Sequence, residues 1–174
     1  MKYLLILLLL ASCSKPMSSI GLSTSYLKEN NKAFKTEYEP EPTITFTHLF
    51  DYKGNKLGYS TNRIDNWLSG RNKQDIKLNN GVRAMREQMI TYDSLLVGKQ
   101  FNRLIPMLYL ANTTIDNKFI INNNVKKKVN HVFLYGANLS YLINKQVSAS
   151  VVYIAPNQEI GIESGFSIGL NYNF

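Results

Sequence analysis

The sequence predicts an all-β fold, an eight-stranded antiparallel up-and-down transmembrane β-barrel. Three observations indicate this class: the composition, a two-residue alternation at the C-terminus, and an alternation of short and long links between strand segments. The 174 residues include 11 Tyr and 8 Phe, and aromatic residues are enriched in strands. With 44% hydrophobic and 18% charged residues, the chain has the composition of a folded protein. Its length suits one domain of ordinary size.

The strongest strand signal lies in the last fifteen residues, 160–174. Large apolar residues recur at most even positions, and the odd positions between them are small or polar. The even face consists of Ile160, Ile162, Ser164, Phe166, Ile168, Leu170, Tyr172 and Phe174. Such a run is longer than most strands of soluble proteins. A transmembrane barrel turns an apolar face of this kind toward lipid and lines its lumen with small polar residues.

Seven further segments show a weaker form of the same alternation. They are 19–26, 43–50, 57–62, a segment within 82–98, 104–112, 130–141 and 147–154. In the fourth and fifth segments both faces carry apolar residues, so the alternation leaves their register open. Pro106 has no N–H to donate, which argues against the fifth strand or indicates a local bulge there.

The links between these segments alternate in length. Short links lie near 52–55, 99–103 and 143–146, and long polar links lie near 27–42, 65–81 and 115–128. Only the short link at 156–159 breaks the alternation. Outer-membrane barrels have short periplasmic turns and longer extracellular loops, so we expect a periplasmic N-terminus and three long loops outside. The third loop contains a predicted hairpin extension, in which 119–121 turns at 122–124 into Val125.

The N-terminus resembles a secretory signal. A basic start is followed by the apolar run Leu4 to Leu10 and by small residues up to Cys13, which are the parts of a cleaved export signal. We therefore expect residues 1–13 to be a signal peptide and residues 14–174 to form the barrel. The segment Leu10 to Cys13 also resembles a bacterial lipobox, and two outcomes stay open: lipidation of Cys13, or cleavage a few residues later. As the single Cys, it excludes an internal disulfide.

As a pattern, the whole mature chain resembles the small eight-stranded outer-membrane proteins of the OmpX and OmpA-barrel type. The most specific part is the tail, where Gly169, Tyr172 and Phe174 are similar to the C-terminal signal that the barrel-assembly machinery reads. Ile168 departs from the polar residue expected before the glycine. The resemblance implies a bacterial outer-membrane location, and we expect no peptidoglycan-binding domain of the kind that follows the barrel in full-length OmpA.

One carboxylate falls on the predicted lumen face. Glu163 occupies an odd position in the last strand, and a charge inside a barrel needs a partner. Arg83 or Arg86 from another strand is the expected partner. An ion pair that plugs the lumen is one interpretation, and a proton or ion path is the other. A general diffusion pore is not expected, because side chains fill the lumen of an eight-stranded barrel.

Basic residues concentrate in the predicted outer loops, and the net charge of the whole chain is +8. We expect five of them to face the phosphates of lipopolysaccharide, a role to be weighed against that of a generic solvated loop. The five are Arg71, Lys73, Lys126, Lys127 and Lys128. The expected partners are thus outer-membrane lipid, lipopolysaccharide and the barrel-assembly machinery. We expect a monomer that binds no nucleic acid, no metal and no cofactor.

The leading function is a non-enzymatic structural or surface-interaction role: adhesion, envelope integrity or modification of a host surface. A lipid A–modifying acyl hydrolase or transferase is the alternative. It would need His48 or His131 close to Asp93 and Ser94, although neighbouring strand residues point to opposite faces. A third possibility is a soluble lipoprotein with a β-sandwich or lipocalin-like barrel, whose apolar face would point inward.

Overall fold

The computed structural model describes residues 15–30, 35–37, 41–63, 72–78, 81–122, 124–159 and 161–174. Ten strands form within these ranges. They are β1 (Lys15–Asn30), β2 (Lys35–Glu37), β3 (Glu41–Tyr52), β4 (Asn55–Thr61), β5 (Asn72–Lys77), β6 (Arg83–Lys99), β7 (Leu104–Ile121), β8 (Asn124–Leu142), β9 (Val147–Ile154) and β10 (Ile162–Asn173). The described part of the chain contains no helix that is long and apolar enough to cross a membrane.

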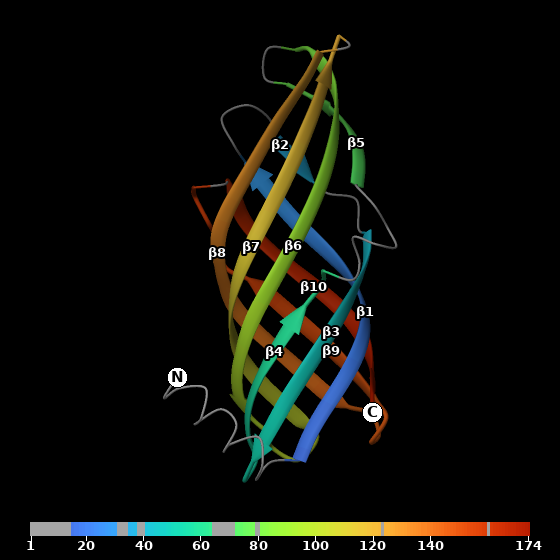
Figure 1. Cartoon of the computed structure of the whole chain (residues 1–174), viewed down its shortest axis with the longest axis vertical. Helices are drawn as coiled ribbons and strands as arrows, with labels where there is room; N and C mark the ends of the chain where they lie inside the picture. Colours follow the sequence, from blue (N-terminus) through green and yellow to red (C-terminus); the bar gives the residue numbers. More distant parts are fainter. Residues whose placement is uncertain are drawn as a thin grey trace.

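Eight of these strands close into a ring (Figure 1). Antiparallel pairing runs in the order β1, β3, β4, β6, β7, β8, β9 and β10, and β10 pairs back with β1. The seam between the first and last strands joins Ser19 to Asn173 and continues for eleven residue pairs. The backbone of Ser18 also exchanges hydrogen bonds with that of Phe174, at 2.8 and 3.3 Å. This closed ring confirms the predicted eight-stranded barrel. Its closure also removes free strand edges.

The structure supplies the register of the two strands that the alternation left open. β6 pairs with β7 from Gly98↔Met107 to Met85↔Ile120, and β7 pairs with β8 from Leu104 to Ile121 without a register shift. Pro106 therefore lies in a regular strand, and the suggested bulge is wrong. It sits one residue beyond the last β6–β7 pair, so its missing N–H interrupts none of the pairs between these strands.

Three strands run far past the rest of the ring. β6, β7 and β8 have 17, 18 and 19 residues, and their far ends form a sheet that protrudes from the barrel, with β5 paired to β6 (Figure 1). We call this sheet, made of residues 72–78, 82–89, 115–122 and 124–130, the extension. Ile121↔Asn124 closes its β7–β8 hairpin, which confirms the predicted hairpin extension. The short strands β2 and β5 were not predicted. Most residues of the links that flank them are outside the described ranges.

The barrel has a turn end and an extension end. The turns at Lys53–Gly54, 100–103 and 143–146 share the turn end with the seam pair Ser18 and Phe174. Two of these turns use a left-handed backbone: Lys53, Gly54 and Asn102 have φ of 52°, 82° and 57°, a conformation that Gly and Asn tolerate best. The predicted alternation of short and long connections thus reflects the two ends of one barrel.

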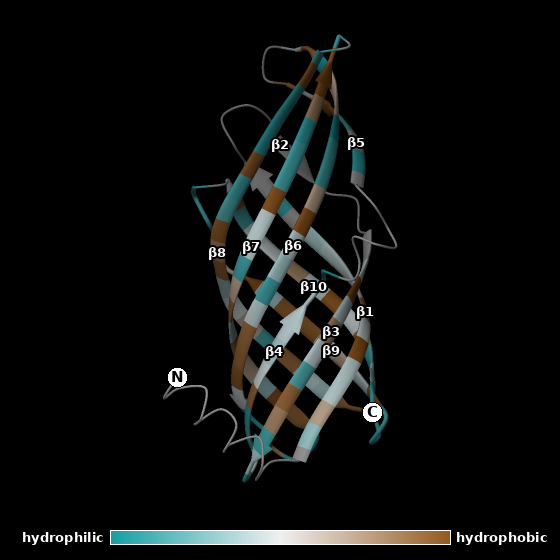
Figure 2. Ribbon diagram, in the orientation of Figure 1, coloured by the Kyte–Doolittle hydropathy of each residue, from teal (hydrophilic) through white to brown (hydrophobic). Residues whose placement is uncertain are grey.

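Hydrophobic and hydrophilic residues alternate along strands of the ring (Figure 2), and their exposed fractions show that the side chains alternate between its outer and inner surfaces. Leu95, Leu108, Phe133, Ile168 and Leu170 point outward and are each more than half exposed. The inner surface holds mostly small residues, and close packing uses several glycines. A Cβ on Gly136 would lie 1.9 Å from the backbone oxygen of Tyr153 and 2.8 Å from the Tyr109 ring, so no larger residue fits there without a shift.

Two apolar clusters lie inside the ring. The lower cluster, at the turn end, consists of Leu49, Leu96, Ile105 and Met107. The upper cluster, toward the extension end, consists of Ala111, Ile115, Val132, Leu134 and Ile162. Tyr109 packs against both. A third, small cluster at the tip of the extension joins Ile76 and Ala84 with Phe119 and Ile121.

Ile162 corrects one detail of the predicted alternation. An outward position was expected, yet Ile162 is 2% exposed and belongs to the upper cluster. The register between β1 and β10 shifts here, since Lys28 pairs with Ser164 and Glu29 with Ile162. Glu163 is therefore the extra residue of a β-bulge, and a bulge reverses the facing of the residues beyond it.

Candidate functional site

The outer surface of the ring forms an apolar belt. Its exposed side chains include Ile20, Leu22, Leu95, Leu108, Leu139, Val151, Leu170 and Tyr172. Tyr26 and Phe166 stack on this surface, with ring centroids 4.8 Å apart and planes inclined by 13°. Contiguous apolar surface of this extent marks contact with a membrane or a partner. The soluble lipocalin-like interpretation required an inward apolar face, and the outward belt shows that it is wrong.

The extension carries most of the charge. It contains eight basic residues and only three acidic ones, Asp75, Glu87 and Asp116. Alternation along its strands gives two faces: the belt-side face continues the outer surface of the barrel, and the lumen-side face continues its interior. All three acidic residues share the belt-side face, since Asp75 pairs with Met85 and Glu87 with Lys118.

The belt-side face is largely neutralised by ion pairs. Glu87 lies between two lysines, 3.0 Å from Lys118 Nζ and 4.0 Å from Lys73 Nζ. Lys127 Nζ lies 3.7 Å from the Asp116 carboxylate. Glu87 and Asp116 are nearly buried while Lys73 and Lys127 are about two-thirds exposed. Two of the five predicted basic residues thus have acidic partners, and Arg71 lies outside the described residues.

The lumen-side face is different, because its described charges are all positive. Arg86 is buried, and its Nε donates to Asn117 Oδ1 at 2.8 Å. Its guanidinium also lies 5.9 Å from the centre of the Phe119 ring, so this arginine is held inside the sheet. Lys126 and Lys128 are exposed on the same face, and neither forms an ion pair with another described residue. They are the two exposed cations of this face that have no acidic partner in the described part of the chain.

Glu163 does not form the predicted lumen charge. Its carboxylate lies 2.8 Å from Lys28 Nζ, in a pair whose side chains are 38% and 60% exposed. Arg86, one of the two expected partners, instead donates to Asn117. The bulge at Glu163 turns this side chain toward the rim beside β1. Glu163 is not among the described residues that line the cavity inside the barrel.

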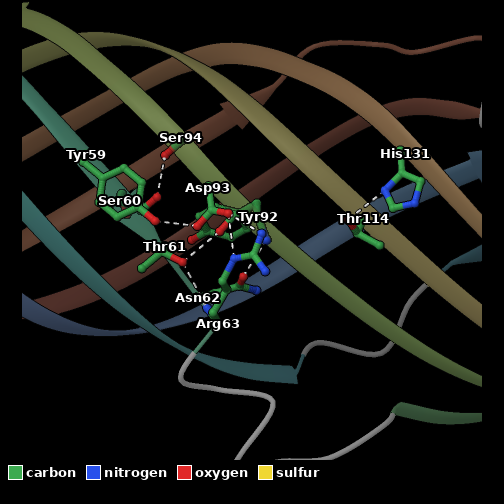
Figure 3. A network of polar contacts seen from close by, with 10 residues as sticks. All are labelled: Tyr59, Ser60, Thr61, Asn62, Arg63, Tyr92, Asp93, Ser94, Thr114 and His131. Atoms are coloured by element: carbon green, nitrogen blue, oxygen red, sulfur yellow. Dashed lines mark hydrogen bonds and ion pairs between the residues drawn. The ribbon is translucent and has the colours of Figure 1, made fainter. Parts of the chain in front are cut away.

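A polar cluster lies on the outer surface where β4 ends (Figure 3). Asp93 Oδ1 accepts a hydrogen bond from Tyr59 at 2.5 Å, and Oδ2 accepts one from Arg63 Nε at 2.6 Å. The Asp93 carboxylate raises the pKa of the Arg63 guanidinium, which lies beyond the end of the strand. Asp93 pairs with Asn112 across β6 and β7, so polar residues replace the apolar belt at this level.

The histidines do not complete the predicted lipid A–modifying site. His131 lies apart from Asp93 and contacts Thr114 Oγ1 at 3.1 Å (Figure 3). Ser94 points inward, where its hydroxyl donates to the backbone of Ser60 at 3.2 Å. The predicted site, with Asp93, Ser94 and a histidine on a common face, is therefore wrong.

A serine–histidine contact does occur elsewhere. Ser18 Oγ lies 2.7 Å from His48 Nδ1, and the His48 ring meets Phe50 edge-on at 4.7 Å. The pairing of β1 with β3 creates this contact, which a two-residue alternation cannot reveal. No carboxylate joins it among the described contacts, and no group of three His, Cys, Asp or Glu suited to a metal occurs in the described ranges.

The predicted assembly signal occupies the seam. Tyr172 and Phe174 are 55% and 64% exposed on the outer surface, and Gly169 packs inward, where a Cβ would lie 2.9 Å from Ser23 Cβ. Its recognition by the assembly machinery stays a prediction. Deletion of Phe174 should reduce the heat-modifiable, folded fraction in isolated outer membranes, and an unchanged fraction would contradict it. Cys13 and the signal peptide lie outside the described residues.

The fold is that of the small outer-membrane β-barrels of the OmpA and OmpX type. Ail, the attachment invasion locus protein of Yersinia pestis, is similar with a TM-score of 0.59 and 12% identity, over 91% of this chain and 97% of Ail. The N-terminal β-barrel domain of OprF from Pseudomonas aeruginosa is similar with a TM-score of 0.55 and 11% identity, over 92% of this chain and 99% of the OprF domain. Neisserial surface protein A is similar with a TM-score of 0.50 and 8% identity, over 91% of this chain and 97% of that protein. No family model and no curated protein matches the sequence.

Proposed function

We propose that this protein is an outer-membrane barrel with a surface-interaction role, whose extension binds clustered phosphate or sulfate groups outside the membrane. The observation that carries the proposal is the uneven distribution of charge in the extension. All three acidic residues lie on the belt-side face, whereas Lys126 and Lys128 stand exposed on the lumen-side face without an acidic partner among the described residues. Such a surface attracts anions.

The apolar belt ends well before this surface, and outer-membrane barrels have their longer loops on the extracellular side. On β7 the exposed apolar residues end at Leu110, and polar residues begin at Asn112. Counted from Leu110, eleven residues lead to Ile121 at the tip. At about 3.3 Å per residue and a tilt of about 40°, the tip stands roughly 25–30 Å beyond the belt. Lipopolysaccharide phosphates and soluble polyanions are both within reach of a surface at that height.

The comparison with Ail agrees with this chemistry. A second Ail structure, similar with a TM-score of 0.60 and 11% identity, was solved in complex with the heparin analogue sucrose octasulfate. That ligand belongs to Ail, and the low identity carries no binding residue over to this chain. The support for the present proposal comes from the lysines of the extension.

The experiment compares lysines on the two faces. We would place the wild type, K126Q/K128Q and K127Q in neutral lipid nanodiscs and measure binding of lipopolysaccharide and of sucrose octasulfate at two salt concentrations. K126Q/K128Q should weaken binding about tenfold, since two cations at roughly 0.5–1 kcal/mol each are lost. K127Q serves as the matched control, because Lys127 lies between them but pairs with Asp116. Binding should also weaken at high salt.

The two ligands distinguish the source of the anionic groups. A loss limited to lipopolysaccharide would assign the surface to the surrounding leaflet, and a loss limited to sucrose octasulfate would assign it to soluble glycans. Equal binding by K126Q/K128Q and the wild type would contradict the proposal. A double variant at the turn end, K99Q/R103Q, controls for net charge and should bind like the wild type.

The interior supports a barrel that does not act as a diffusion pore. The lower cluster packs apolar side chains at the turn end of the lumen, and Lys56, 4% exposed, pairs with Asp51 nearby at 2.5 Å. Apolar side chains at this level disfavour the passage of ions. Reconstituted protein should therefore show no open-channel conductance in planar bilayers, and steady unitary conductance in the wild type would overturn this part of the proposal.

A further inference from the structure

The barrel encloses a cavity of about 240 Å³ that the surface role does not use. Its lining begins at Met17, Leu49 and Ile105 in the lower cluster and reaches Ser25 and Thr43 toward the extension end. One water needs only about 10–15 Å³ of such space. Side chains can fill the lumen of an eight-stranded barrel. In this barrel they leave part of the lumen open.

The cavity has two chemically different walls. β1, β3, β9 and β10 contribute mostly hydroxyl and amide side chains: Ser19, Thr45, Thr47, Ser150, Ser167 and Asn171 are examples. β6 and β7 contribute mostly apolar ones: Ile90, Leu96, Ile105, Met107, Ala111 and Ile115. The ring order places β6 opposite β10 and β7 opposite β1. A polar wall thus faces an apolar wall across the lumen.

None of the described lining residues carries a charge. The buried pair of Lys56 and Asp51 lies at the turn end, outside the lining, and Glu163 lies at the rim. An ionic ligand inside this cavity would lose hydration without gaining a counter-charge. The lining therefore selects against charged molecules.

Two lining groups have unused hydrogen-bonding capacity. Thr113 Oγ1 and Asn173 Nδ2 are buried, in residues that are 1% and 4% exposed, and neither has a hydrogen-bond partner within the protein. Buried polar atoms of this kind need a partner from the cavity. Water could serve these two groups, but water against Ile105, Met107 or Ala111 lacks the two to four polar partners that hold it.

Aromatic rings add a stacking surface to the apolar wall. Tyr92 and Tyr109 line the cavity, and Tyr109 is positioned by packing over Gly136 and by a 3.2 Å hydrogen bond from its hydroxyl to the Tyr153 backbone. The ring is thus fixed by its own contacts. An apolar face of a ligand could lie against it while displacing poorly bonded water, which favours binding.

We propose that the lumen is a binding site for a small uncharged molecule with one apolar face and one hydroxylated edge. A pyranoside has this form, since its ring C–H groups make an apolar face and its hydroxyls make the edge. The hydroxylated edge bonds to the Ser, Thr and Asn side chains of β1, β3, β9 and β10. The apolar face packs on the wall formed by β6 and β7. This site is separate from the basic extension.

The test uses methyl β-D-glucopyranoside as the probe and the full barrel in lipid nanodiscs. Methyl NMR signals of Ile105, Ile115 and Leu134 report on the lumen, and those of Ile168 and Leu170 report on the belt. Addition of the probe should shift the lumen signals in a saturable way and leave the belt signals unchanged. Glucose 6-phosphate, which carries a charge, should cause no saturable shift at the same concentrations.

A matched pair of variants on β9 sharpens the test. Ser150→Phe fills the cavity from a buried position, whereas Val151→Phe adds the same ring at a position that is 48% exposed on the belt. S150F should abolish the shifts and V151F should retain them, with folding of both checked by heat-modifiable mobility. Absence of saturable lumen shifts in the wild type, or equal shifts with glucose 6-phosphate, would overturn the proposal. The comparison of the two sugars needs no variant, so it decides the matter even if S150F does not fold.

Discussion

Three long strands, β6, β7 and β8, run through both the ring and the extension, yet their outward side chains meet different surroundings in the two regions. Along β6 the outward Leu95 is 63% exposed in the ring, whereas Glu87, on the same outer side in the extension, is 9% exposed and flanked by lysines. The change occurs near Asp93, where Tyr59 and Arg63 form the polar cluster. One strand therefore crosses from a lipid environment to an aqueous one.

The two regions are stabilised in different ways. In the ring every strand is paired on both sides, and its outward apolar groups are stable only against lipid. In the extension, β5 and the far half of β8 are edges, and stability depends on ion pairs and on the small tip cluster. Lysines along the exposed edge of β8 also discourage edge-to-edge pairing with other chains.

The largest expected effect comes from a charge in the belt. Leu170→Arg should destabilise the folded barrel by about 2–4 kcal/mol, because a lipid-facing arginine near mid-membrane is costly. Urea unfolding in phosphatidylcholine vesicles, followed by electrophoretic mobility, measures this change. Val129→Arg, at an outward position 47% exposed in the extension, should change stability by less than about 0.5 kcal/mol. Equal losses in the two variants would mean that the belt does not end where we place it.

The next effect tests the closeness of packing in the ring. Gly136→Ala should cost about 2–3 kcal/mol, since the new methyl group would overlap the Tyr153 carbonyl and the Tyr109 ring. Gly81→Ala in the turn before β6 meets no atom within 4 Å but has a φ of 85°, and strain of this kind costs about 1–2 kcal/mol. The same unfolding assay applies. A smaller loss for G136A than for G81A would contradict the assigned packing.

A smaller effect should stay within the extension. Glu87→Gln removes the carboxylate between Lys73 and Lys118, so amide hydrogen exchange should increase several-fold in β5 and the far ends of β6 and β7. Exchange in β9 and β10 should not change, because local opening follows local stability. Asp75→Asn, at an exposed position of the same sheet, is the control. Uniform acceleration across the barrel would show that the extension does not open separately.

The smallest effect is expected at the rim. Glu163→Gln breaks the pair with Lys28, whose side chain is 60% exposed, and exposed ion pairs contribute about 0–1 kcal/mol. The free energy of unfolding should change by less than about 1 kcal/mol, and mobility on boiling should match the wild type. A loss above about 3 kcal/mol would point to a buried charge and restore the lumen interpretation.

Much of the ring could be predicted because membrane strands repeat one simple alternation. Each of the eight predicted segments overlaps one strand of the ring, and the hairpin at 119–125 was also correct. The candidate site was harder to predict. Glu163 was misplaced because a one-residue bulge reverses the facing of Ile162, and alternation along one strand contains no record of a bulge in its pairing. Likewise, the contact between Ser18 and His48 depends on the register between two strands.

The class of fold and the two ends of the barrel could be predicted from the sequence, since a period of two and the lengths of the links are local properties of the chain. Strand pairing and ring closure were needed to learn which basic residues are neutralised and which residues line the lumen. Lys127 and Lys128 are neighbours in sequence, but the register of β7 places Asp116 near Lys127 only. In the same way, a polar wall faces an apolar wall because ring closure brings β1 and β10 opposite β6 and β7. Pairing and closure join residues that are distant along the chain, and no local pattern contains that information.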